Sequence, residues 1–168
     1  MSTHIDVLVG DYESCVRWNY EAILADDHCM KSSPSTAGTI SFYFGYIVHN
    51  YHMLVYGCIL GGMEEKAMQV ARKLNGYLNE FMFTDYPDLV AYLEAYSALE
   101  VHVMVRFGRW EDILLLEPPK DKHLMLFRAA TIIFAKGLAY ANLGNISLAK
   151  KGSGSFRFSA EGPKHGNA

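Results

Sequence analysis

Residues suited to a buried helix face recur every three or four positions near the start of the chain, which is the spacing of one side of an α-helix. Between residues 13 and 25 this side comprises Cys15, Val16, Asn19, Ala22 and Ile23. We expect a helix over residues 13–25 that is stopped by Asp26-Asp27. The segment 28–39, which contains Ser, Pro and Gly, predicts a loop.

The same spacing predicts further helices in the middle of the chain. One covers about residues 43–60 and ends at Gly61-Gly62, and the next covers about residues 64–80. One face of the second of these carries Ala67, Val70, Ala71 and Leu74. Pro87 suits a first helical turn, so Thr84-Asp85-Tyr86-Pro87 is expected to begin a helix that continues to Arg106.

Proline and glycine bound the predicted helices in the last third. A short helix begins at Trp110 and is ended by Glu117-Pro118-Pro119, because proline cannot continue the backbone hydrogen bonds. A long helix covers about residues 121–143 and ends at Gly144, and another begins over residues 146–151. The predicted fold class is therefore all-α.

Composition restricts the class of protein. The chain has 168 residues, of which 51% are hydrophobic and 20% charged, enough for one domain with a packed core. The net charge is −3 without a cluster of Lys or Arg, which argues against a nucleic-acid partner. The three cysteines are widely spaced. That spacing disfavours a disulfide framework and favours a reducing, cytoplasmic compartment.

One apolar stretch raises the question of a membrane. No Asp, Glu, Lys or Arg occurs between Lys31 and Glu64, and residues 40–63 are largely apolar. Polar side chains in the middle of this stretch and four glycines interrupt it. Because polar groups are costly at bilayer depth, the sequence favours a buried helix over a transmembrane span, and no membrane partner.

The end of the chain changes character. Residues 152–168 are dominated by Gly, Ser, Lys and Pro, and such a segment buries too little apolar surface to offset its ordering entropy. We expect a helical repeat domain over residues 1–151 and a disordered tail over residues 152–168.

A short pattern recurs four times along the expected repeat domain. Each copy has a glycine after an apolar helix end and a small or apolar residue five positions later. The glycines are Gly10, Gly62, Gly108 and Gly144, and the later residues are Cys15, Ala67, Ile113 and Ala149. We expect the glycine to adopt a left-handed conformation that ends one helix. The small residue then lets the next helix pack closely.

This pattern resembles the tetratricopeptide repeat (TPR). The segment 137–144, Gly-Leu-Ala-Tyr-Ala-Asn-Leu-Gly, matches the first helix of that repeat, and the region around Gly10 matches the second. The four glycines are 52, 46 and 36 residues apart, against about 34 in the family. The resemblance implies a short TPR-like α-solenoid whose concave groove binds a protein or peptide, without a cofactor.

A closer resemblance is to bacterial and algal TPR proteins of unassigned function. It rests on the segments 3–5 (Thr-His-Ile), 22–26 (Ala-Ile-Leu-Ala-Asp), 49–52 (His-Asn-Tyr-His) and 106–114, which begins Arg-Phe-Gly-Arg-Trp. No settled activity comes with this resemblance. We expect the repeat domain to be incomplete at both ends, and apolar surface exposed there would favour self-association.

The clearest candidate site is the His-Asn-x-His segment, His49-Asn50-Tyr51-His52. His49 and His52 share a helix face, and His4 or His102 could join them to bind zinc. The alternative is that both histidines and Asn50 form hydrogen bonds with neighbouring loops. No further ligand lies at a recognised spacing, so the sequence favours the alternative, with no metal.

Tyrosines of the first helices are the candidates for peptide contact. They are Tyr43, Tyr46, Tyr51, Tyr92, Tyr96 and Tyr140. Tyr51 and Tyr96 suit peptide binding and inter-helix packing equally, whereas Tyr140 occupies the packing position of the TPR pattern.

The remaining candidates are charged residues and one thiol. Arg106 and Arg109 could bind a carboxylate, but such residues more often cap helix carbonyls or pair with Glu100 or Glu111. Cys15 is expected to be a core thiol, and Asp26-Asp27 to lie in solvent at a helix end.

No nucleophile, paired carboxylates or phosphate-binding loop is recognisable, so the sequence predicts a protein- or peptide-binding scaffold and no enzyme. Two alternatives remain open. One is a metal-binding or enzymatic domain that uses the His-Asn-x-His segment, and the other is a fragment without independent activity.

Overall fold

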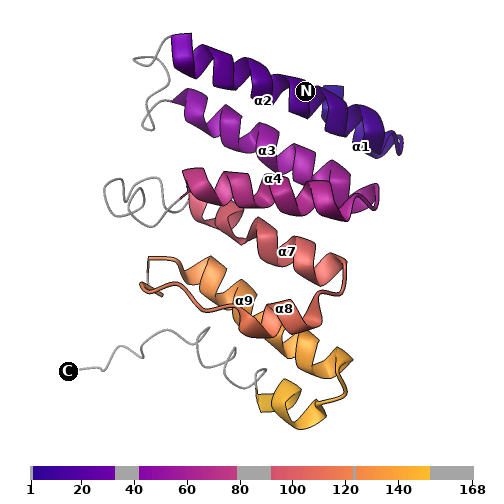
Figure 1. The fold of residues 1–168 in the computed structure, drawn as a ribbon, viewed down its shortest axis with the longest axis vertical. Helices are drawn as coiled ribbons and strands as arrows, with labels where there is room; N and C mark the ends of the chain where they lie inside the picture. Colours follow the sequence, from indigo (N-terminus) through magenta and orange to yellow (C-terminus); the bar gives the residue numbers. More distant parts are fainter. Residues whose placement is uncertain (1, 33–41, 79–91, 123, 152–168) are drawn as a thin grey trace, which may run out of the picture. The chain divides into compact units, whose positions relative to one another are not determined.

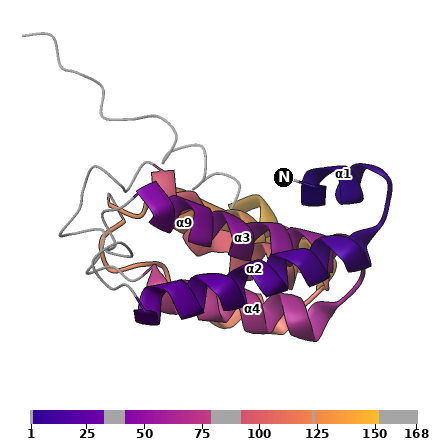
Figure 2. The ribbon, with the colours of Figure 1, turned by 90° about the horizontal axis from the view of Figure 1, so that it is seen from above.

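All regular secondary structure in the described part of the chain is helical (Figure 1, Figure 2). The structure is a computed structural model that describes residues 2–32, 42–78, 92–122 and 124–151. No strand occurs within these ranges, which confirms the all-α fold class there. The helix start expected at residues 84–87 and the tail 152–168 lie outside the described residues.

The chain divides into two compact units, Met1–Val103 and Met104–Ala168. The first contains α1 (Ser2–Leu8), α2 (Tyr12–Ser32), α3 (Phe42–Leu60), α4 (Glu64–Tyr77) and the 3-10 helix η1 (Glu94–Ala98). The division falls inside α7 (Leu99–Arg106). In the first unit α2 packs on α3 and α3 on α4, while α1 packs against both α2 and α3.

The second unit holds the last helices. They are α8 (Trp110–Leu115) and α9 (Leu126–Asn142), which pack on each other, followed by helical residues 146–151. The short helix at Trp110 and the helical start at residue 146 are as the sequence predicts.

All four glycines of the repeated pattern adopt the left-handed conformation. Gly10, Gly62, Gly108 and Gly144 have φ between 69 and 81°. Within the described ranges no other residue has a positive φ. After each glycine the next amide N–H donates to a carbonyl five residues back, as Asp11 does to Asp6 at 2.8 Å. This is the Schellman arrangement that closes a helix, so the predicted role of the glycines is confirmed.

Alanine substitution should separate the conformational role of these glycines from packing. A Cβ at Gly62 or at the helical Gly76 would meet no atom within 4 Å. Gly62→Ala is therefore expected to destabilise the protein by about 1–2 kcal/mol, the cost of a left-handed backbone for an L-residue. Gly76→Ala should stabilise it by roughly 0.5 kcal/mol. Urea unfolding measures both, and equal effects would contradict the assignment.

The core of the first unit depends on a close approach of α2 and α3. Cys15 and Val16 of α2 are buried, and a Cβ added to Gly57 would lie 3.1 Å from Cys15 Sγ and from Val16 Cγ2. The thiol at the small position of the first repeat is thus a packed core group, as expected, and burial raises the pKa of Cys15. The face of α4 with Ala67, Val70, Ala71 and Leu74 is also buried, as predicted.

The prediction that Asp26-Asp27 ends the second helix is wrong. The helix α2 continues to Ser32, so residues 28–32 are helical and not part of a loop. Asp26 is only 7% exposed. Its Oδ1 accepts a 2.5 Å hydrogen bond from Tyr43 Oη, and its Oδ2 accepts a 2.9 Å bond from Asn50 Nδ2. Because α3 satisfies this carboxylate, the helix can bury it and continue.

Two other boundaries differ from the sequence prediction. The helix expected over residues 64–80 ends at Tyr77. The helix expected from residue 121 begins at Leu126. Ahead of it the Asp121 side chain accepts a hydrogen bond from the amide of Leu124 at 2.9 Å. This local turn replaces the first helical turn, as Asp side chains often do at helix starts.

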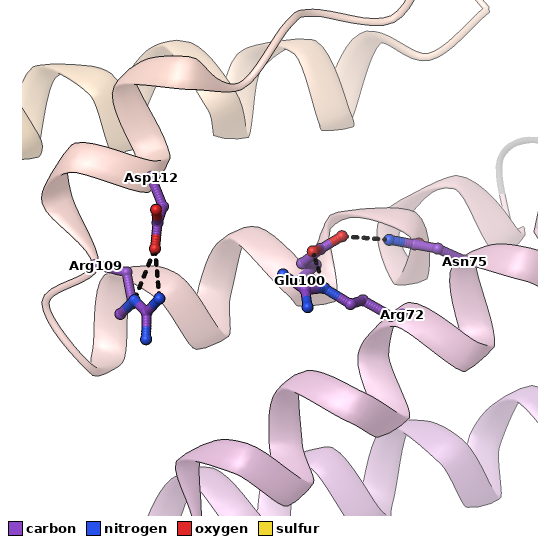
Figure 3. Close-up of polar contacts among 5 residues, drawn as sticks. All are labelled: Arg72, Asn75, Glu100, Arg109 and Asp112. Carbon is purple, nitrogen blue, oxygen red and sulfur yellow. Dashed lines mark hydrogen bonds and ion pairs between the residues drawn. The ribbon is translucent and has the colours of Figure 1, made fainter.

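Two ion pairs involve Glu100 and Arg109 (Figure 3). Glu100 accepts hydrogen bonds from Arg72 Nε at 2.8 Å and Asn75 Nδ2 at 3.2 Å, which join α7 to α4. Arg109 pairs with Asp112 at 2.7 Å, at the start of α8. Glu100 thus connects α7 to α4, and Arg109 binds the carboxylate of Asp112 three residues further along the chain.

Among the described helices, none has the length and apolar content needed to cross a membrane. The apolar stretch around α3 instead supplies much of the core, with Phe44, Ile47, Val48, Leu54 and Val55 buried.

Candidate binding pocket

The first unit contains a hollow of about 530 Å³ between α1, α3 and η1. Most of its wall is apolar, and the polar part consists of imidazole and phenol groups. The lining residues are His4, Val7, Leu8, His49, His52, Met53, Tyr56 and Tyr96. A concave, largely apolar site with a few convergent polar groups is the usual form of a binding pocket.

Helical periodicity brings these side chains together. His4, Val7 and Leu8 lie at positions i, i+3 and i+4 of α1, and the α3 residues follow the same rule over two turns. Each helix therefore presents one face to the hollow, and Tyr96 of η1 closes a third side. The pocket depends on α1, because that helix supplies the first of the three imidazoles.

The rings in the pocket form a continuous array of contacts. His4 and His49 lie with centroids 5.2 Å apart and planes 15° from parallel. His49 and His52 are 6.4 Å apart. His52 in turn stacks on Tyr56 at 6.3 Å and meets Tyr96 edge-on at 5.3 Å. The structure thus joins His4 to the sequence-predicted pair of histidines.

The pocket lowers the basicity of His49 and His52. Desolvation is the main cause that lowers the pKa of His49 and His52, and charge on the neighbouring histidines lowers it further. His102 of α7 contributes to the effect on His52. Desolvation also raises the pKa of Tyr96. At neutral pH both His49 and His52 are therefore neutral, each with one N–H donor and one acceptor.

These shifts predict how stability depends on pH. Since the folded-state pKa of His49 and His52 is below the ordinary value of 6.5, the unfolded chain takes up protons first as the pH falls. The free energy of unfolding is expected to decrease below pH 6.5, through the window down to the folded values. Urea unfolding at pH 7.5 and 5.5 measures this. A His49→Gln, His52→Gln double variant should show a smaller decrease in the free energy of unfolding between these pH values. The control is His28→Gln, at an exposed position of α2, which should show the same decrease as the unaltered chain.

The His-Asn-x-His segment does not form one site. His49 and His52 line the hollow, whereas Asn50 donates a hydrogen bond to Asp26. Asp26 lies within α2, so the partner of Asn50 is a helix residue and not the loop residue that the sequence predicted. Within the described ranges no group of three or more His, Cys, Asp or Glu side chains is placed to hold a metal ion. His4 and His49 are stacked face to face, so their faces rather than their nitrogens point toward each other, and the ring of His52 is tilted by 42° from that of His49.

The tyrosines divide between packing and the pocket. Tyr51 is 1% exposed and packs against Tyr77 with ring centroids 5.7 Å apart, which is the packing role. Tyr96 lines the pocket, with Tyr92 edge-on to it at 6.1 Å. Tyr43 binds Asp26, and this hydrogen bond raises the pKa of Tyr43 above its usual range.

Arg106, the arginine that the sequence offered as a binding residue, does not line the pocket. Arg106 is exposed, and its guanidinium lies 5.5 Å from the centre of the Phe107 ring. This is a cation–π arrangement between chain neighbours. Arg106 belongs to the second compact unit and is not among the residues that line the pocket.

Four pocket residues were not anticipated from the sequence. They are Val7, Leu8, Met53 and Tyr56. A signal was present, because Met53 and Tyr56 lie four and seven positions after His49, on the same helix face. An apolar face next to polar rings looks the same in sequence whether it packs in a core or lines a hollow, so only tertiary placement separates the two.

Comparison of the chain with models of protein families, with curated proteins and with solved structures finds no match in any of the three.

Proposed function

We propose that this protein is a TPR-like helical repeat scaffold that binds a protein or peptide through the pocket between α1, α3 and η1. The observation that supports this most is the hollow itself. At about 530 Å³ it has the size of an ordinary ligand pocket. An apolar wall with ring donors at fixed places suits one or two side chains of a peptide better than a catalytic step.

The repeated glycine pattern supports the part of the proposal that concerns a helical repeat architecture. The helix pairs α1–α2 and α3–α4 are each joined by a left-handed glycine, at Gly10 and Gly62. Helix pairs of this type stack into extended concave surfaces in repeat proteins. Such surfaces recognise peptides through Tyr and other rings that lose little conformational entropy on binding.

The rim of the pocket offers a test that leaves the fold intact. Leu8 is 85% exposed and lines the pocket, so Leu8→Glu should not cost folding stability. Leu115 on α8 is 79% exposed and is not a pocket residue, so Leu115→Glu is a matched control. Peptides would be selected from a displayed random library on the unaltered chain and measured against both variants.

We expect selected peptides to lose at least about tenfold in affinity on Leu8→Glu, which corresponds to about 1.4 kcal/mol. The Leu115→Glu variant should bind them as the unaltered chain does. A library that yields no enriched peptide, or peptides that are insensitive to Leu8→Glu, would argue against binding in this pocket.

A further inference from the structure

We propose that the pocket recognises an acidic side chain, the carboxylate of an Asp or Glu flanked by apolar residues in a peptide, and takes up a proton when it binds. This inference rests on the proposed function, because it names the ligand chemistry of the same pocket. It is carried by the clustering of three imidazoles in one apolar hollow.

The donors of the pocket converge without an acid among them. His4, His49 and His52 stand in one array, and Tyr56 and Tyr96 bracket His52. Within the described part of the chain, no Asp or Glu is among the residues that line the hollow. An imidazolium offers two N–H donors and a phenol offers one, whereas a carboxylate offers only acceptors. The described wall therefore complements a carboxylate and offers no carboxylate that would neutralise a cation.

The charged groups that act on His49 and His52 all disfavour protonation of these histidines. His49, His102 of α7 and His4 of α1 disfavour protonation of His52, and His4 and the chain's amino group disfavour that of His49. The carboxylates of the neighbouring helices have other partners: the charge of Asp6 of α1 raises the pKa of Cys15 of α2. Asp26 of α2 binds Tyr43 and Asn50. Lys73 of α4 pairs with Asp27.

An anion in the hollow would reverse this balance. It would supply the opposite charge that the array lacks, so a histidine that is neutral in the free protein would be protonated in the complex. Binding and proton uptake are then linked. For each proton taken up, affinity rises about tenfold for each unit by which the pH falls, in the range between the pKa of the complex and that of the free protein.

The apolar wall restricts the anion to one carried on a peptide. Val7 and Leu8 of α1 and Met53 of α3 surround the imidazoles. A free small anion would leave this surface uncovered, whereas apolar residues beside a Glu would bury it. A basic peptide would be repelled once any of the three histidines is protonated.

The test uses two tripeptides that differ in one group. Acetyl-Leu-Glu-Leu-amide is the probe, and acetyl-Leu-Gln-Leu-amide is its uncharged counterpart. Binding to the full chain is measured by calorimetry at pH 7.5 and 5.5, in buffers of different ionisation enthalpy so that proton uptake is measured directly. We expect the Glu peptide to bind at least tenfold more tightly at the lower pH, with proton uptake, and the Gln peptide to show neither effect.

Single variants test whether the histidines of the pocket take up the proton. His52→Gln should remove most of the pH dependence for the Glu peptide, and His49→Gln should reduce it. His28→Gln, on the exposed part of α2, is the matched control and should retain it. Circular dichroism at both pH values shows which variants are folded, and a folded His49→Gln protein keeps the test valid if His52→Gln does not fold.

The outcomes separate this inference from the proposed function. Equal, pH-independent binding of both peptides, lost in Leu8→Glu, would overturn the carboxylate inference and keep peptide binding in the pocket. Tighter binding of the Glu peptide at low pH that survives both histidine variants would also overturn it. Binding of neither peptide would overturn the inference, while the displayed-library selection would still decide the proposed function.

Discussion

Replacing Tyr51 by alanine is expected to lower the free energy of unfolding by about 3–5 kcal/mol, the usual cost of removing a large aromatic ring from a core. Tyr51 is 1% exposed at the middle of α3. Its ring packs against the tilted ring of Tyr77 of α4, and Lys73 Nζ of α4 lies 5.4 Å from its centre. Alanine would leave a cavity between α3 and α4 that these side chains can fill only in part.

The matched control is Tyr46→Ala in the same helix. Tyr46 is 51% exposed, so we expect its loss to cost less than about 1 kcal/mol. Tyr51→Phe keeps the ring and should retain most of the stability. Urea unfolding followed by circular dichroism measures all three. A Tyr51→Ala protein as stable as Tyr46→Ala would show that α3 and α4 do not pack through this ring.

Replacing Asp26 by alanine is expected to destabilise the protein by about 2–4 kcal/mol. A hydrogen bond to a charged group contributes about 1.5–3 kcal/mol, and a buried partner left unsatisfied adds a further cost. Here Tyr43 Oη and Asn50 Nδ2 would both lose their acceptor. These bonds connect α2 to α3 across the segment 33–41, so the helix pair should also lose its fixed register.

A double-mutant cycle tests the network more sharply than the single change. Asp26→Asn retains one carbonyl acceptor and should cost less than Asp26→Ala. If Asp26 and Tyr43 interact directly, the cost of Tyr43→Phe should shrink in the Asp26→Ala background, and the two changes should not add. Additive effects, measured by urea unfolding, would contradict the hydrogen bond.

The pocket and the Asp26 network use opposite sides of one short segment. Within His49-Asn50-Tyr51-His52, the histidines line the hollow, Asn50 reaches α2 and Tyr51 reaches α4. Successive helical residues point about 100° apart, so four consecutive positions necessarily serve different neighbours. The polar residues in this apolar helix therefore have separate roles: two build the candidate site and one satisfies a buried carboxylate.

The sequence alone determined the local features of this protein. The recurrence of apolar residues predicted α3 and the buried face of α4, because helical periodicity is a property of the chain itself. The four glycines predicted the left-handed helix ends, because only glycine adopts that backbone at little cost. The small position at Cys15 predicted close packing for the same kind of local reason.

Only the tertiary structure decided which neighbours each residue meets. Asp26 resembled a solvated helix end in sequence, and only the Tyr43 and Asn50 side chains of α3 make its burial possible. His4 lies 45 positions before His49, and nothing local brings their rings within 5.2 Å. The packing of α1 against α3 does so, because contacts between distant segments depend on how whole helices pack and not on the spacing within either one.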